Sequence, residues 1–412
     1  MAKTGELLKA KDIIILDGGL GTELEFRGYD LSQDPLWSAG LVQRDPGALA
    51  AIHRSYLEAG ADVITAATYQ GSIGPMTEQL FAELVRIAVS TRDKFVQDHQ
   101  AEIEFVGAPK RLGESLDSPT GDDVNDNINA PRRQQRKWPL VAVGMGPYGA
   151  YLGKGQEYTG DYGEVSKSTL IEFHRRKLEA LAAEGIEPEL LLFETIPNSL
   201  ELAAIADLLQ QQNQKQKQPT KVWLALSVRF DKNATPNGHN QVFLADGTPL
   251  TSAESSAASN SNSSLEPQFR ALAPYISAIG VNCCPLDKVE LALTELGAIF
   301  SQSSMSALSP TPPLLIAYPN SGEVYSGETK TWSLPTTQNN SKEGLGTGNA
   351  ATCPNSATCN TNEANAEEDC GWDLAGNSQA WIRKGARIIG GCCRTRPADI
   401  AKLRKTIGDR LD

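Results

Sequence analysis

Eight short apolar segments, rich in β-branched residues, recur along this 412-residue chain with helix-like stretches between them. Each segment is apolar along nearly its whole length, which is typical of parallel strands covered on both faces. The predicted strands are 13–17, 61–69, 140–146, 190–196, 221–228, 278–283, 313–318 and 386–390. Eight β/α units predict an α/β fold, a parallel (β/α)8 TIM barrel, with a doubly wound open sheet as the second choice. The number of repeats favours the barrel.

Helical periodicity fills most of the intervals between these strands. The predicted helices cover residues 46–60, 77–103, 165–185, 198–214, 286–300 and 397–411. Three polar segments without an apolar period interrupt the repeat, and we expect them to be flexible loops inserted into one barrel domain spanning 1–412. These insertions are residues 107–138, 251–266 and 335–370. They explain why the chain is longer than the roughly 250 residues typical of such a barrel.

The charge balance argues against several classes of partner. Lys and Arg total 38 and Asp and Glu total 50, giving a net charge of −12, so we expect neither nucleic acid nor an anionic membrane as a partner. No segment approaches the roughly 18 apolar residues of a membrane span, and the N-terminus lacks the apolar region of a signal peptide. The seven cysteines include two adjacent pairs, which do not resemble a secreted disulfide framework. The sequence therefore predicts a cytoplasmic protein, and it leaves the oligomeric state open.

The two cysteine pairs close two of the predicted strands. Cys283 and Cys284 end the segment AIGVNCC, and Cys392 and Cys393 end ARIIGGCC. Functional groups of such barrels lie at the carboxyl ends of the strands, so these thiols would converge if the two strands were close neighbours. Three converging thiolates with an open fourth position describe a catalytic zinc site, whereas the simpler alternative is four buried apolar cysteines.

The sequence also indicates which thiols of each pair face the site. Adjacent strand residues point to opposite sides, which favours Cys283 over Cys284 as a ligand. A sharp turn at the preceding glycine pair, 390–391, would allow both Cys392 and Cys393 to face the same point.

Two carboxylates follow predicted strands. Asp17 is either a turn or capping residue or a carboxylate at the mouth of the site. Glu194 comes directly after an apolar run, so it either forms an internal salt bridge or faces a ligand, because an unpaired buried charge is costly. Two carboxylates at one mouth would suit a substrate that carries an ammonium group.

Motifs at nearly every strand end resemble the homocysteine S-methyltransferases, zinc-dependent barrels related to betaine–homocysteine methyltransferase and to the homocysteine module of cobalamin-dependent methionine synthase. The matching segments are LDGGLGTEL (16–24), PLWSAG (35–40), AGADVITAATYQ (59–70), FETIP (193–197), GVNCC (280–284), AYPNSGE (317–323) and IIGGCCRT (388–395). The resemblance implies a Zn²⁺ cofactor held by Cys283, Cys392 and Cys393. No protein side chain is implied as catalytic beyond zinc activation of the substrate thiol.

The resemblance also implies how the amino acid substrate is held. Asp17 and Glu194 would bind the amino group of homocysteine, assisted by backbone near Gly18 and by Thr68, with the neighbouring Thr65 as the alternative to Thr68. A free thiol with a pKa of about 8.5 is only a few per cent thiolate at pH 7, and coordination to zinc deprotonates it. The thiolate would then accept a methyl group to form methionine.

The length of the chain bears on the methyl donor. It has no room for folate and cobalamin modules, and only 412 − 393 = 19 residues follow the last cysteine of the barrel, unlike the extended betaine enzyme. We therefore expect a small sulfonium donor, S-methylmethionine or S-adenosylmethionine, received by aromatic side chains such as Tyr69, Tyr148 and Tyr318. The alternatives are a betaine-type or other thiol methyltransferase, a cofactor-binding barrel oxidoreductase with incidental cysteines, and a binding barrel whose zinc is structural.

Overall fold

The computed structural model describes most of the predicted strands and helices. It describes residues 12–31, 34, 36–100, 103–104, 136–214, 221–231, 241–251, 264–309, 311–326, 331–333 and 372–408.

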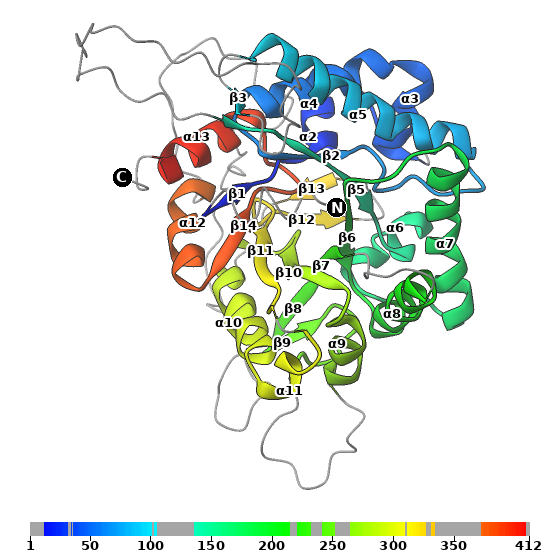
Figure 1. The fold of residues 1–412 in the computed structure, drawn as a ribbon, viewed down its shortest axis with the longest axis vertical. Coiled ribbons are helices and arrows are strands. Elements are labelled where there is room, and N and C mark those ends of the chain that lie inside the picture. The colour runs from blue at the N-terminus through cyan, green and yellow to red at the C-terminus, as the bar shows by residue number, and fades with distance from the viewer. Residues whose placement is uncertain are drawn as a thin grey trace, which may run out of the picture.

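Eight parallel strands form the centre of the molecule (Figure 1). They are β1 (Ile14–Ile15), β2 (Val63–Ala66), β5 (Leu140–Met145), β6 (Leu190–Ile196), β7 (Val222–Leu226), β10 (Ile276–Asn282), β11 (Leu314–Tyr318) and β14 (Ala386–Ile389). Their order in the sheet is β1-β14-β11-β10-β7-β6-β5-β2. A parallel bridge from Leu16 to Val63 joins β1 to β2, the two strands at the ends of this order, and the Asp17 N–H donates to the Val63 carbonyl at 3.0 Å. The predicted TIM barrel is confirmed, and the open sheet is excluded because β1 and β2 are not free edges.

Several predicted strands are longer than the observed ones: 13–17 shortens to β1, 61–69 to β2 and 221–228 to β7. In the last of these the Ser227 N–H still donates to the Ile196 carbonyl of β6, but the Ser227 carbonyl accepts from the Ala245 N–H. The chain then leaves the barrel as β8 (Val228–Asp231), which pairs antiparallel with β9 (Gln241–Leu244). An apolar run alone does not reveal this change of partner.

Eight helices surround the strands. They are α4 (Pro46–Glu58), α5 (Glu78–Asp98), α7 (Lys167–Ala183), α8 (Ser199–Asn213), α9 (Glu266–Leu272), α10 (Val289–Phe300), α12 (Leu374–Arg383) and α13 (Pro397–Gly408). Side-chain caps fix several of their starts: Asp45 accepts from the Ala48 N–H, and Thr77 accepts from the Leu80 N–H. Contacts between α13 and α4 close the ring. All six predicted helices occur, whereas α9 and α12 flank the predicted insertions and were not predicted.

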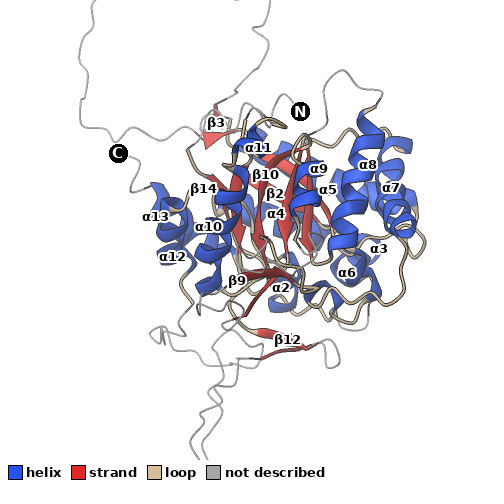
Figure 2. Ribbon diagram, turned by 90° about the horizontal axis from the view of Figure 1, so that it is seen from below, coloured by secondary structure: helices blue, strands red, loops and turns tan. Residues whose placement is uncertain are grey.

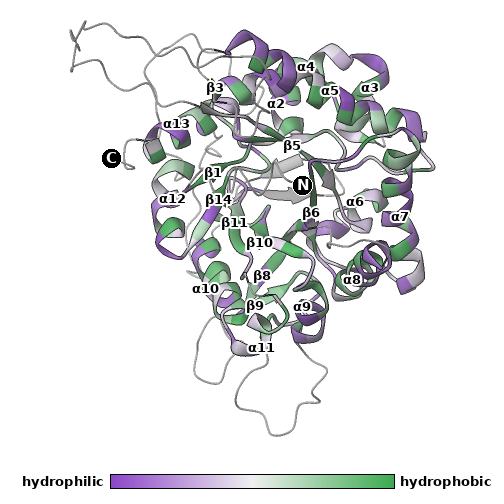
Figure 3. Cartoon of the chain, in the orientation of Figure 1, coloured by the Kyte–Doolittle hydropathy of each residue, from purple (hydrophilic) through white to green (hydrophobic). Residues whose placement is uncertain are grey.

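The apolar side chains form two layers. One cluster fills the inside of the barrel and includes Leu16, Leu192 and Trp223; the other lies between the strands and the helices. Figure 3 shows mainly hydrophobic strands at the centre, surrounded by helices that carry both hydrophilic and hydrophobic residues. After the register shift between Ile276 and Ala278, Ala278 belongs to the inner cluster and Ile279 and Val281 to the outer one, so even-numbered positions of β10 point into the barrel from 278 onward.

Short elements that follow the strands gather at the carboxyl end of the barrel, where α2, β9 and β12 lie together in Figure 2. Sequence periodicity did not predict them, because each is too short to show a period. They are α2 (Leu20–Phe26), η1 (Trp37–Gly40), α3 (Leu41–Arg44), α6 (Tyr148–Leu152), η2 (Gln156–Tyr158), η3 (Leu286–Lys288) and the hairpin of β12 (Val324–Ser326) with β13 (Thr331–Ser333). Elsewhere lie α11 (Ser303–Ser306) and the pair β3 (Ile103–Glu104) and β4 (Arg136–Lys137).

The three predicted insertions lie almost entirely outside the described residues and stay predictions. Only their ends are described: Trp138 is half-buried, Leu265 is buried, and Glu266 begins α9. Within the described ranges, no helix combines the length and the apolar character needed to span a bilayer.

Candidate active site

A cavity of about 390 Å³ opens at the carboxyl ends of the barrel strands, a size suited to small ligands. Its walls come from segments that are far apart in the sequence: the loops after β1, β2, β5, β10 and β14, and the end of β6. The side chains that line it include three thiols and several buried carboxylates, which are described in turn below.

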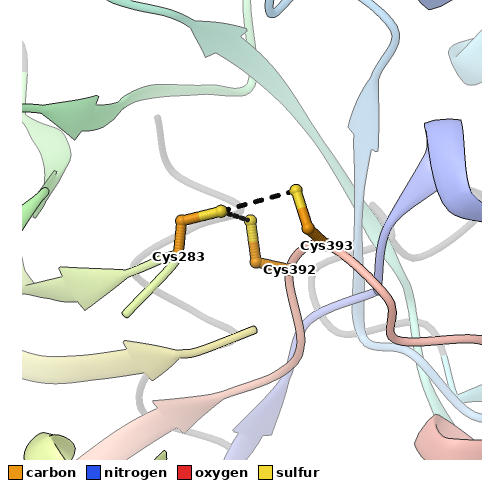
Figure 4. Close-up of side chains that lie close together, drawn as sticks. All are labelled: Cys283, Cys392 and Cys393. Atoms are coloured by element: carbon orange, nitrogen blue, oxygen red, sulfur yellow. Dashed lines mark hydrogen bonds between the residues drawn. The ribbon is translucent and has the colours of Figure 1, made fainter. Parts of the chain in front are cut away.

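Three thiols converge on this cavity (Figure 4). The Sγ atom of Cys283 lies 2.9 Å from that of Cys392 and 3.5 Å from that of Cys393, and all three lie within 4.8 Å of one another. They are free thiols, and two ligand sulfurs of a tetrahedral zinc ion are about 3.8 Å apart, as follows from a Zn–S bond of about 2.3 Å. The soft donor set therefore suits zinc, and binding it would move the Cys283 and Cys392 sulfurs apart from their 2.9 Å separation. The structure thus brings together the three cysteines that the sequence singled out.

Cys283 faces the cavity because its backbone is left-handed. The alternation of β10 would send position 283 to the outer side of the barrel, together with Ile279 and Val281. A φ of 50° at Cys283 turns the chain at this point, so that its side chain lines the cavity and Cys284 enters the outer apolar core. Burial raises the pKa of the Cys284 thiol. The preference for Cys283 agrees with its placement, although strand alternation was the wrong reason for it.

Gly390 and Gly391, which precede the second cysteine pair, are needed for close packing and not for a left-handed backbone. A Cβ on Gly390 would lie 2.5 Å from the Cβ of Leu16, and one on Gly391 would lie 2.1 Å from Cγ2 of Thr395. Both Cys392 and Cys393 therefore reach the cavity through a turn that tolerates no side chain at the two preceding positions.

The thiols also influence one another's protonation. Hydrogen bonding from Cys392 and Cys393 lowers the pKa of Cys283 well below its usual value. The hydroxyl of Tyr158, from η2, lies 3.7 Å from the Cys283 Sγ. Hydrogen bonding to Cys283 raises the pKa of Cys392 and of Cys393 well above the usual value, so the cluster as it stands favours one thiolate, on Cys283.

Asp17 is both a structural and a cavity residue. Its carboxylate accepts hydrogen bonds from the Thr65 N–H at 2.7 Å and the Thr65 hydroxyl at 3.2 Å, and it also lines the cavity. Burial raises its pKa from 3.8 to about 7. Gly18 beside it lines the cavity too, with no room for a side chain because its Cβ would lie 2.8 Å from the Thr395 carbonyl oxygen.

The position of Thr68 corrects its predicted role. Its hydroxyl is fully buried and donates to the Gly144 carbonyl at 2.8 Å, and Thr68 is absent from the cavity wall. Thr65 lines the cavity instead. Tyr148 is also displaced from its predicted place, since it packs against Tyr162 and Phe173, whereas Tyr69 and Tyr318 do line the cavity.

Glu194 is buried in the cavity wall and forms no salt bridge with any residue that the structure describes. The Tyr318 hydroxyl donates to its carboxylate at 3.4 Å. Burial, followed by the charge of Asp17, raises its pKa from 4.5 to about 8. The charge of the buried Lys177 lowers this pKa in part, but no ion pair to Glu194 occurs among the described residues. Within them the alternative of an internal salt bridge is not supported, and Glu194 is a buried carboxylate that an ammonium group would stabilise.

Sequence reasoning missed the pair that holds Glu194 in place. Asn282, fully buried at the end of β10, accepts from the Thr195 N–H at 2.8 Å and donates to the Thr195 hydroxyl at 2.7 Å. Thr195 has a φ of 57°, which is unfavourable for a β-branched residue, and the strand ladder shifts register here. A polar residue inside the apolar run AIGVN was the signal that could have identified Asn282.

Three other cavity residues were not singled out as site residues. Glu157 and Tyr158 belong to the one-turn helix η2, and Trp37 belongs to η1, within the matching segment 35–40; all three line the cavity. None of them follows a barrel strand directly, so the rule that strand ends carry function does not find them.

Comparison with known proteins identifies the class of protein that uses this arrangement. Residues 14–407 match the family model described as homocysteine S-methyltransferase. The chain belongs to the homocysteine S-methyltransferase family. It is therefore an enzyme of that family, and the resemblance found in the sequence is confirmed. The alternative of a cofactor-binding oxidoreductase is excluded at the level of the family.

Relatives from plants and bacteria match nearly the whole chain. It is 31% identical over 404 residues to homocysteine S-methyltransferase 3 of Zea mays, covering 96% of this chain and 90% of the relative. It is 30% identical over 406 residues to homocysteine S-methyltransferase YbgG of Bacillus subtilis, covering 96% of this chain and 95% of the relative. The metallated form of the homocysteine methyltransferase MmuM from Escherichia coli superimposes with a TM-score of 0.60 at 28% identity, covering 97% of this chain and 98% of that one.

Proposed function

We propose that this protein is a zinc-dependent enzyme that transfers a methyl group from S-methylmethionine or S-adenosylmethionine to the thiol of L-homocysteine, forming methionine. The observation that carries the proposal is the convergence on one cavity of three thiols and two buried carboxylates, neither of which has a salt bridge to a described residue. The three thiols would bind a zinc ion. An amino acid substrate would place its own thiol on that zinc ion and its ammonium group against the two carboxylates.

Cys283, Cys392 and Cys393 would hold the zinc ion. Bound there, zinc would supply a Lewis acid that keeps the homocysteine thiol deprotonated at neutral pH. The fully buried Cys284 lies in the apolar core and is left out of the ligand set. Three protein ligands leave one position for the substrate, which favours a catalytic over a structural site.

Asp17 and Glu194 would bind the ammonium group of homocysteine. Both carboxylates are buried, and their pKa values are raised to about 7 and about 8, so a positive charge between them would favour their ionised forms. Thr65 fixes the orientation of Asp17 through its N–H and its hydroxyl, and the Tyr318 hydroxyl does the same for Glu194. Backbone at Gly18 completes this end of the cavity.

The chain's main contribution to the rate would be positioning. A cavity that holds the amino group at one end and the thiol at the other fixes the acceptor sulfur within the near-attack distance of about 3–3.5 Å from a bound methyl group. Burial of the cavity residues also limits the water that competes for the methyl donor.

The test is methionine formation from homocysteine by zinc-loaded protein, with S-methylmethionine, S-adenosylmethionine and betaine supplied in parallel. We expect turnover with at least one sulfonium donor and none with betaine. Cys392→Ser should lose both zinc and activity, with Cys284→Ser as the matched control that keeps both. Absence of methionine with every donor would contradict the proposal, and turnover with betaine alone would reassign the donor.

A further inference from the structure

Glu157 is a buried carboxylate that the functions assigned above leave without a role. Its residue is only 6% exposed, and its Oε2 atom has no hydrogen-bond partner among the residues that the structure describes. It lines the same cavity as the three thiols. A hydrogen bond from its own backbone N–H lowers its pKa in part, but burial outweighs this effect, so a cation in the cavity would stabilise the carboxylate.

Glu157 lies on the thiol side of the cavity. The next residue, Tyr158, places its hydroxyl 3.7 Å from the Cys283 Sγ, and the charge of Cys283 raises the pKa of Glu157 in addition to the effect of burial. The charge of Cys283 also raises the pKa of Glu194, after burial and the charge of Asp17, so the three carboxylates share one electrostatic environment. Glu157 differs from the other two in its element, because it lies on η2 next to Tyr158, whereas Asp17 follows β1 and Glu194 lies in β6.

The helix that carries Glu157 is held firmly in place. Gly149 packs so closely beneath it that a Cβ there would lie 2.6 Å from the Glu157 nitrogen. The half-buried Tyr69 lies within electrostatic reach of both Glu157 and Cys283. A fixed carboxylate beside aromatic side chains is a favourable environment for an organic cation that carries no N–H donor.

We propose that Glu157 is the counter-ion for the positively charged sulfonium of the methyl donor. This inference rests on the proposed methyl transfer and adds the residue that selects a cationic donor. Tyr69 and Tyr158 line the cavity beside it and contribute aromatic surface for the methyl groups of the cation.

The chemistry of the transfer explains why a counter-ion at this place is useful. The homocysteine thiolate supplies an electron pair to the methyl carbon, while the bond from that carbon to the donor sulfur breaks and its pair stays on the donor. No proton moves in this step. The donor enters as a cation and leaves as a neutral thioether, so a carboxylate that attracts the donor no longer attracts the product, which favours exchange.

The first test is Glu157→Gln, which keeps the shape and hydrogen-bonding capacity of the side chain and removes its charge. Two methyl donors are compared with saturating homocysteine: S-methylmethionine, which is a cation, and methyl iodide, which is neutral. We expect kcat/KM for S-methylmethionine to fall at least tenfold, through a higher KM, while the rate with methyl iodide stays within twofold. Calorimetric titration of S-methylmethionine into zinc-loaded, homocysteine-free protein should show the same loss of affinity.

Glu295→Gln is the matched control. Glu295, on α10, also has a pKa raised to about 7 by burial, and its Oε2 atom has no partner in the described part of the chain. Its other oxygen accepts from the Val242 N–H at 3.1 Å. It does not line the cavity. Removing its charge should leave both donors and the titration unchanged.

The outcomes separate this inference from the proposed function. If wild-type protein forms methionine but Glu157→Gln uses S-methylmethionine as well as wild type does, Glu157 is not the counter-ion and the methyl transfer stands. An equal loss with both donors would show a structural role and also overturn the inference. If the variant does not fold, a competition experiment on wild-type protein replaces it. Choline should compete with S-methylmethionine at least tenfold more strongly than its neutral analogue 3,3-dimethylbutan-1-ol. Equal competition by the two compounds would refute the inference.

Discussion

Replacing Asn282 with alanine tests whether the reciprocal pair with Thr195 holds the site together. Asn282→Ala removes the acceptor of the Thr195 N–H and the donor to its hydroxyl, which lie 2.8 and 2.7 Å away. Both Thr195 groups are buried, and each buried polar group without a partner costs about 1–3 kcal/mol. We therefore expect the free energy of unfolding to fall by about 2–6 kcal/mol, a large share of the stability of an ordinary domain.

The assay is urea unfolding of metal-free protein, combined with a double-mutant cycle. Thr195→Ala removes only the hydroxyl, so the cycle isolates the bond between the two side chains, which we expect to contribute about 0.5–1.5 kcal/mol. Asn377→Ala is the control, because Asn377 donates to the Asp373 carbonyl at the start of α12, away from the cavity; we expect a change within about 0.5 kcal/mol.

The same variant should also affect the site, because Thr195 directly follows Glu194. Loss of Asn282 frees Thr195 from its left-handed φ of 57°, a conformation that costs about 1–3 kcal/mol, and the Glu194 carboxylate loses its fixed direction. The KM for homocysteine should then rise. A loss of stability below about 1 kcal/mol, or additive effects in the cycle, would refute the reasoning that this pair maintains the strained backbone.

The remaining predictions concern the ligands, the carboxylates and the threonines. Cys284→Ala should keep the full zinc content measured by metal analysis at a cost of about 1 kcal/mol of stability, whereas Cys283→Ala should lose zinc; zinc loss from Cys284→Ala would contradict the three-cysteine ligand set. Burial raises the pKa of Glu194 from 4.5 to about 8, so the ligand-free native state binds more protons than the unfolded state between these pH values. As pH rises from 4.5 to 8, this residue therefore lowers the free energy of unfolding by up to about 5 kcal/mol. Glu194→Gln should flatten the pH dependence of urea midpoints between pH 4.5 and 8, and an unchanged slope would contradict the raised pKa. Thr65→Val should raise the KM for homocysteine several-fold, while Thr68→Val should cost about 1–2 kcal/mol of stability and leave that KM unchanged; the opposite pattern would restore Thr68 to the site.

The fold could be predicted from the sequence because its signal is local and repeated. Every barrel strand is an apolar run long enough to recognise, and each of the six predicted helices shows a regular period. The errors fall where a segment is short or changes partner, as at Ser227 and in the one-turn helices of the cavity rim. Such segments contain too few residues to show a period, and tertiary contacts decide their conformation.

The site could be predicted in part for a related reason. Strand ends of a barrel converge, so unusual residues after apolar runs pointed to the three cysteines, Asp17 and Glu194. Glu157 lies in a loop whose sequence shows no such position, and the choice between Thr65 and Thr68 depends on how β2 ends. These residues are defined by what they contact across the cavity, which a sequence pattern does not contain.

The sequence by itself determined the number of strands, the family and the residue types that the chemistry needs. The tertiary structure decided which side chains face the cavity, and Cys283 is the clearest case. Its place in the strand would direct it outward, but a hydrogen bond from its N–H to the Tyr318 carbonyl and one from the Asn320 side chain to its own carbonyl accompany the left-handed backbone that turns it inward. Periodicity encodes the direction of a side chain only while the backbone stays regular, and at the end of a strand long-range contacts set that direction.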